Sequence, residues 1–80
     1  MGTQSLTLRQ VVAAELRAEM ARQRRTGVEL AVVLQCSQQS ASRRLNGGQG
    51  LDLDDLPLIA EWLGISVMDL IAPARERVAS

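Results

Sequence analysis

The sequence predicts an all-α fold, a compact bundle of five short helices. Three observations lead to this class. Apolar residues recur at four-residue steps, which is close to the period of an amphipathic helix. Capping residues, glycines and prolines divide the chain into five helical segments. The length of 80 residues, of which 46% are hydrophobic, suits one small core with short connections.

The first predicted helix begins after Thr7, a capping residue. Its apolar stripe consists of Leu8, Val12, Leu16 and Met20 at four-residue steps, which is wide enough to face a core. The polar run over 22–25 ends this helix. Residues 1–6 lack periodicity, and we expect them to be a flexible start.

A short second helix is predicted over residues 27–34. Thr26 and Glu29 form a capping box at its start, in which each side chain accepts a hydrogen bond from the other residue's backbone N–H. Gln35 and Cys36 then break the helical pattern and predict a tight turn.

The third helix is predicted over residues 37–46. Ser37 caps its start, and Gly47 suits the left-handed position that follows a helix. Its apolar positions are limited to Ala41 and Leu45. A helix with so thin an apolar seam is expected to turn a broad polar face outward.

Two further helices complete the predicted bundle. Asp52 or Asp54 is expected to cap the fourth helix, and Asp54 is the better candidate because Pro57 then falls near the first turn. Gly64 ends this helix. Ser66 caps the fifth helix, and Pro73 is expected to stop it. The sequence therefore predicts one domain over residues 7–72 and a charged tail over residues 73–80.

Composition excludes several classes of function. The chain has no His, so no imidazole can act as a general base or metal ligand, and its single Cys cannot form an internal disulfide or a Cys-rich zinc site. We therefore expect a protein that is not an enzyme and that has no metal, no cofactor and no small-molecule substrate. No apolar run approaches the roughly 20 residues of a membrane span, and the first residues lack the pattern of a secretory signal. These features predict a cytoplasmic, nucleoid-associated protein without a membrane partner.

Charge is distributed unevenly, although the formal net charge is zero. Residues 1–47 hold seven Arg and three Glu, a charge of +4. Residues 48–80 hold two Arg and six acidic residues, a charge of −4. The basic half suits a partner that carries phosphate groups.

The second and third helices have the layout of a helix-turn-helix, in which the second helix of the motif enters the major groove of DNA. Here the sequence resembles the lambda-repressor/Cro-like, or XRE, family of helix-turn-helix regulators. The matching residues are Thr26-x-x-Glu29-Leu30-Ala31, Ser37-Gln38-x-x-Ala41-Ser42-Arg43-x-Leu45-Asn46-Gly47, Leu56-x-x-Ile59-Ala60-x-x-Leu63-Gly64-Ile65-Ser66 and Leu70-Ile71. Two positions depart from the family pattern. Gly27 stands where many members have Gln, and Gln35 stands where Gly usually makes the turn, so a positive φ is expected at Gln35.

The resemblance implies a set of DNA contacts. Residues at the start of the third helix and one turn later are expected to contact bases: Gln38, Gln39, Ser42 and Arg43. Gln can bond adenine N6 and N7, and Arg can bond guanine O6 and N7. Contacts to phosphate are expected from residues around both helices of the motif: Arg24, Arg25, Thr26, Ser37, Arg44 and Asn46. Arg44 could equally fold back over the core.

The predicted function is that of a sequence-specific, double-stranded DNA-binding transcriptional repressor, either a phage immunity repressor or a Cro-like regulator. Two alternatives stay open. One is a restriction–modification controller or an antitoxin-type regulator of the same fold. The other is a protein–protein interaction module, which the polar face of the third helix disfavours because such a face should carry apolar anchors.

A homodimer is expected on a palindromic operator. Val67 and Leu70 match positions that close the core in the family, which leaves Met68 and Ile71 as an outward apolar pair on the fifth helix. A small apolar patch of this kind often marks a contact between proteins. The alternative is that both residues pack under the tail and the chain is a monomer.

Overall fold

A computed structural model describes the backbone of residues 7–79 and the side chains of residues 7–73. This part of the chain forms five helices and no strand: α1 (Leu8–Gln23), α2 (Gly27–Leu34), α3 (Gln38–Leu45), α4 (Asp55–Leu63) and α5 (Val67–Ala79). The all-α fold predicted from the sequence is confirmed. The predicted flexible start over residues 1–6 lies outside the described residues.

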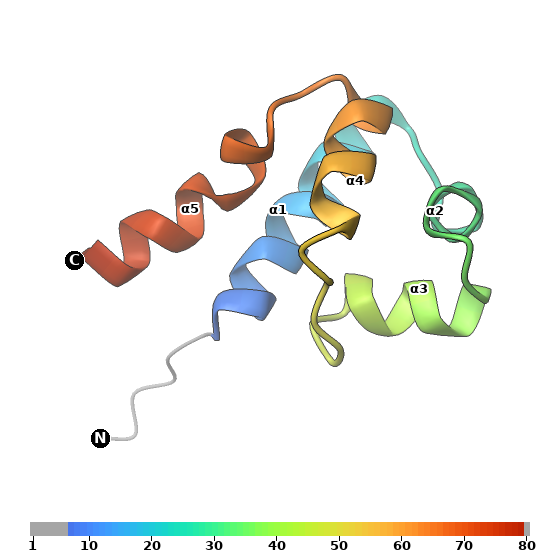
Figure 1. The fold of residues 1–80 in the computed structure, drawn as a ribbon, viewed down its shortest axis with the longest axis horizontal. Coiled ribbons are helices and arrows are strands. Elements are labelled where there is room, and N and C mark those ends of the chain that lie inside the picture. Colours follow the sequence, from blue (N-terminus) through green and yellow to red (C-terminus); the bar gives the residue numbers. More distant parts are fainter. Residues whose placement is uncertain (1–6, 80) are drawn as a thin grey trace.

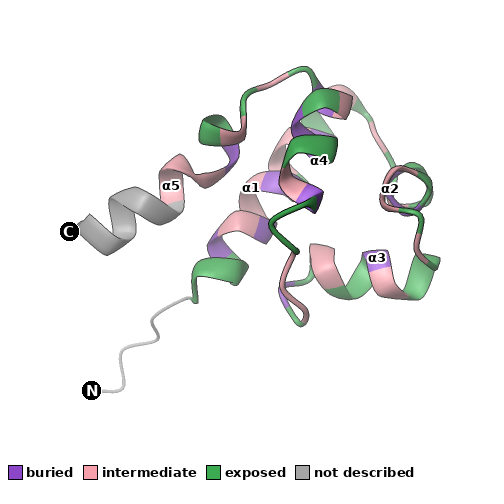
Figure 2. Cartoon of the chain, in the orientation of Figure 1, coloured by how far each residue is buried: buried purple, intermediate pink, exposed green. Residues whose placement is uncertain are grey.

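The helices pack around one core. In Figure 1, α5 runs beside α1, α4 crosses in front of α1, and α3 lies beneath α2 and α4. Four helices each contribute one fully buried large side chain, namely Leu16, Leu30, Ile59 and Leu70. In α3, Ala41 is the residue that is buried (Figure 2). The recognition helix expected from the sequence therefore buries only one of its eight residues.

Hydrogen bonds at the helix starts confirm four predicted caps. Thr7 and Gln10 form a capping box, as do Thr26 and Glu29. Ser37 accepts a hydrogen bond from the backbone N–H of Ser40 at 3.0 Å. Ser66 and Asp69 exchange side-chain to backbone hydrogen bonds of 3.1 and 3.2 Å at the start of α5. Each cap stabilises its helix by about 1 kcal/mol.

Asp54 occupies the predicted capping position of α4, but its side chain does not cap the helix. Asp54 stands at the capping position, but its backbone is helical (φ −70°, ψ −20°) and its side chain makes no capping hydrogen bond. A cap requires an extended backbone, from which the side chain can turn back over the first turn. The neighbouring carboxylate of Asp55 accepts a hydrogen bond from the backbone N–H of Asp52, before the helix, at 3.1 Å.

The predicted end of α5 is wrong, because the helix continues through Pro73 to Ala79. Residues 74–79, which the sequence predicts as part of a charged tail, therefore have a helical backbone. A proline inside a helix removes one hydrogen bond, here to the carbonyl of Asp69, and crowds that carbonyl, but the residues after it can still be helical.

Candidate nucleic-acid interface

The turn between α2 and α3 depends on one left-handed residue. Gln35 has φ 54° and ψ 46°, so the positive φ expected at this position is confirmed. The backbone N–H of Gln35 bonds to the carbonyl of Val32, and that of Cys36 bonds to the carbonyl of Ala31. Cys36 is half-buried and packs against the core. This turn fixes the direction in which α3 leaves α2.

All four predicted base-reading residues lie exposed on α3. Gln38, Gln39, Ser42 and Arg43 are exposed, and Asn46 extends the exposed surface beyond the end of the helix. Opposite them, Ala41 is buried and Leu45 is partly buried. The structure therefore brings the predicted base readers together on one short helix that buries little of itself.

The starts of α2 and α3 present backbone donors. The hydroxyl of Thr26 accepts from the N–H of Glu29, and Ser37 accepts from the N–H of Ser40. Because each cap satisfies the third N–H of its helix, the first two N–H groups have no partner inside the helix. Such N–H groups suit a phosphate, although the carboxylate of Glu29 also lies at the start of α2.

The two arginines after α1 have different environments. Arg24 ends α1 in a left-handed conformation, is exposed, and has no carboxylate of residues 7–73 within 4 Å. Arg25 lies over the ring of Trp62, 5.3 Å from the ring centre, and also contacts the Trp62 carbonyl at 3.4 Å and the carboxylate of Glu29 at 3.9 Å. Arg25 therefore ties the start of α2 to α4, and Arg24 is the better placed of the two for a phosphate.

Arg44 folds back against the bundle, which is the second of the two positions expected for it. Its Nη1 lies 3.3 Å from Oδ2 of Asp55, and each of the two side chains is only 13% exposed. The pair joins the end of α3 to the start of α4. A guanidinium that is held inside the bundle by a carboxylate is not available to a phosphate, so we assign Arg44 a structural role.

Two further arginines lie beside α3 that the sequence did not single out. Arg17 of α1 donates a hydrogen bond from Nη1 to the carbonyl of Leu45, at the end of α3. The side chain of Arg9 lies close to Gly50, in the loop after α3: a Cβ on that glycine would lie 3.8 Å from Cδ of Arg9. The sequence placed both arginines on the side of α1 away from its apolar stripe. It could not show that the end of α3 packs next to that side of α1.

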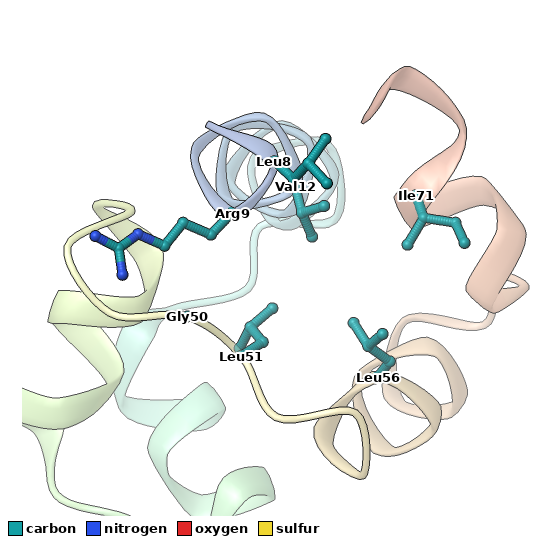
Figure 3. A pocket seen from close by; sticks show the side chains of 7 residues that line it. All are labelled: Leu8, Arg9, Val12, Gly50, Leu51, Leu56 and Ile71. Carbon is teal, nitrogen blue, oxygen red and sulfur yellow. The ribbon is translucent and has the colours of Figure 1, made fainter. Parts of the chain in front are cut away.

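An apolar hollow of about 200 Å³ lies away from the exposed face of α3, between α1, α4 and α5. Its lining comes from Leu8, Arg9, Val12, Gly50, Leu51, Leu56 and Ile71 (Figure 3). Ile71 points into this hollow and packs on the core, so its predicted outward direction is wrong. The reason is that Ile71 lies four residues after Val67 and shares its inward face. Met68 is 47% exposed, as expected.

No single helix in the described part of the chain is long and apolar enough to cross a membrane. Asp55–Leu63 and Val67–Pro73 together have the length and apolar composition of a membrane span, but the two segments are bent by 106° at the break between them. Among the residues that the structure describes, no cluster of potential metal ligands is present.

The tight α2–turn–α3 unit and the exposed polar face of α3 define a helix-turn-helix fold of the kind found in regulators of transcription. The chain is similar to the clp gene regulator ClgR from Corynebacterium glutamicum, for which two solved structures match. In one the TM-score is 0.82 at 28% sequence identity, over 95% of this chain and 81% of that chain. In the other the TM-score is 0.79 at 28% identity, over 90% and 94%. No protein-family model and no curated protein sequence matches the chain. The similarity supports a helix-turn-helix transcription regulator.

Proposed function

We propose that the chain is a sequence-specific, double-stranded DNA-binding transcriptional repressor with α3 in the major groove. The observation that carries this proposal is the division of α3 into a minimal buried seam and an exposed polar face. Gln38 and Gln39 can each form two hydrogen bonds to an adenine, and Arg43 can form two to a guanine. Described residues on this face include no large apolar side chain, which argues against a protein partner as its main ligand.

Backbone contacts in this proposal come from groups around the motif. Arg24, the N–H groups at the start of α2 beside Thr26, the start of α3 beside Ser37, and Asn46 would contact phosphates. These contacts set the orientation of α3 and carry no sequence information by themselves. Repression would follow from occupancy, because a bound domain blocks polymerase at the operator. The setting that we propose is a phage immunity or Cro-like regulator.

The proposed binding unit is a homodimer on a palindromic operator. Among the α5 side chains that the structure describes, Met68 remains the exposed apolar one for this contact, since Ile71 is turned inward. Two copies related by a two-fold axis would place their recognition helices about 34 Å apart, one turn of DNA. Sedimentation of the parent and of Met68→Glu tests the dimer. A parent that is monomeric at tens of micromolar would contradict it and leave the DNA-reading proposal intact.

Selection of DNA from a random duplex pool by the purified chain, followed by affinity measurements, tests the main proposal. Gln38→Ala and Arg43→Ala should each weaken binding to the selected site by about 1–3 kcal/mol, or about 5- to 150-fold, and relax preference at single base positions. Arg22→Ala is the control, since Arg22 is paired with Glu15 and Glu19 on α1.

Two outcomes would overturn this proposal. If no duplex is enriched, the chain is not a sequence-specific DNA-binding protein. If Gln38→Ala and Arg43→Ala bind and discriminate as the parent does, α3 is not the reader.

A further inference from the structure

The carboxyl end of α3 lies against α1, and two arginines of α1 flank it. Arg17 donates a hydrogen bond to the carbonyl of Leu45. The side chain of Arg9 leaves the apolar hollow and extends over the loop after α3, where its Cδ lies near Gly50 (Figure 3). The backbone at Gly47 is close to Gln10 of the same helix, since a Cβ there would lie 3.3 Å from Cα of Gln10. Side chains of α1 and the end of the recognition helix therefore form one continuous surface.

The positive charges of this surface have no ion-pair partner among residues 7–73. Arg9 and Arg17 are both exposed, and no carboxylate of residues 7–73 lies within 4 Å of either guanidinium. Arg22, on the same helix, lies 2.5 Å from Glu19 and 3.3 Å from Glu15. The contrast within one helix separates arginines that are neutralised by the protein from arginines that are available to an anion.

The chemistry of Arg17 suits a bridge between two acceptors. A guanidinium carries five N–H donors in a fixed plane, and the bond to the Leu45 carbonyl uses one of them. The end of a helix also carries a partial negative charge from its free carbonyls, which would repel a phosphate. A cation that is bonded to that end reverses the local sign and keeps further donors for an oxyanion.

We propose that Arg9 and Arg17 hold a backbone phosphate of DNA at the carboxyl end of α3, with Arg17 bridging this phosphate and the carbonyl of Leu45. The inference rests on the proposed function and deepens it. Phosphate contacts at the starts of α2 and α3 would fix one end of the recognition helix, and this contact fixes the other. A helix that is held at both ends cannot rotate or slide in the groove, so its four base-reading side chains keep one register.

The test must separate a phosphate contact from a purely structural bond between Arg17 and α3. Each neutralised phosphate contributes about 0.9 to the slope of log affinity against log salt. Loss of this phosphate contact should therefore weaken binding at 50 mM salt. The ratio of parent affinity to variant affinity should then fall about 3- to 4-fold between 50 and 200 mM. Loss of a structural bond would lower affinity without changing the slope.

The experiment measures binding of the full chain to its selected duplex and to an unrelated duplex between 50 and 200 mM potassium chloride. Arg9→Ala is the decisive variant, because Arg9 makes no hydrogen bond or ion pair within residues 7–73 that its loss would break. Arg17→Ala tests the bridge, and Arg17→Lys keeps the charge while losing the planar fork. Arg22→Ala is the matched control on the same helix.

The expected result is that Arg9→Ala and Arg17→Ala weaken both duplexes alike and lower the salt slope, by about 0.9 in total when both are lost, since the two arginines share one phosphate. Arg17→Lys should keep the parent slope, as should Arg22→Ala. Unchanged slopes in both alanine variants would overturn the inference, and the proposed function would stand if Gln38→Ala still changed base preference. A parent that binds neither duplex would overturn both.

Discussion

Removal of the carboxylate of Asp55 should destabilise the whole domain through Arg44. The guanidinium of Arg44 is only 13% exposed, and its Nε is buried without a hydrogen-bond partner among residues 7–73. The Asp55 carboxylate, 3.3 Å from Nη1, is therefore the counter-charge that makes the burial of Arg44 tolerable. In Asp55→Asn, the cation remains inside the bundle and faces a neutral amide.

The size of the effect follows from burial. Loss of one partner of a buried ion pair costs about 3–5 kcal/mol, and we expect about 3 kcal/mol here because water still reaches the pair. In a domain of this size, that loss lowers Tm by about 12–24 °C. Arg44→Met should cost less, about 1–2 kcal/mol, because the Asp55 carboxylate keeps its bond from the Asp52 N–H. The double variant should resemble Arg44→Met alone, since the stranded cation is gone.

Urea unfolding, followed by helical circular dichroism and by the fluorescence of Trp62, measures these free energies. Asp54→Asn is the matched control, since Asp54 is one residue away, exposed and without a side-chain capping bond. It should change stability by less than about 0.5 kcal/mol. If Asp55→Asn were as stable as Asp54→Asn, the pair would not be structural and the assignment of Arg44 would fail.

Three further predictions concern the motif and the pH dependence of folding. Gln35→Gly should stabilise the domain by about 0.5–1 kcal/mol in urea unfolding, since Gly adopts φ 54° without strain; a loss of stability would contradict this. Ser37→Ala should lower stability by about 1 kcal/mol through loss of the α3 cap; an unchanged urea midpoint would exclude that role. Hydrogen bonds from Arg22 and Gln23 lower the pKa of Glu19 below its ordinary value of 4.5. The contribution of the Glu19 carboxylate to folding stability is therefore complete above pH 4.5 and is lost as the pH falls through the lower folded pKa. Glu19→Gln should make the free energy of unfolding less dependent on pH in the acid range. A pH dependence identical to that of the parent would contradict this.

Features that depend on neighbouring residues were predictable from the sequence. The caps at Thr7 and Ser37, the capping box at Thr26 and the turn at Gln35 each follow from a few adjacent positions. Their hydrogen bonds close within three or four residues, so the pattern already contains both partners. The exposed face of α3 was predictable for the same reason, because its spacing alone separates Ala41 from the polar positions.

Features that depend on residues far apart in the chain were not predictable. Arg44 meets Asp55 across the loop after α3, and Arg25 meets Trp62 of α4 across two intervening helices, α2 and α3. An arginine next to a DNA-reading face is expected to contact phosphate unless a carboxylate or an aromatic ring lies nearer, and only the fold shows which it is. Pro73 is an exception among the features that depend on neighbouring residues. Proline tends to end a helix, but α5 continues through Pro73 to Ala79.

The way in which α3 is held explains how so short a helix can serve as a reader. Eight residues with one buried alanine are far below what an isolated helix needs for stability in water. Polar contacts at its two ends stabilise α3 where its small apolar seam does not. Ser37 caps the start, and Arg17 and the Arg44–Asp55 pair fix the end to α1 and α4. Because these anchors lie at the ends, they leave the middle of the exposed face to Gln39, Ser42 and Arg43. Substitutions at the anchors should therefore change binding to all sequences, whereas substitutions on the face should change which sequence is preferred.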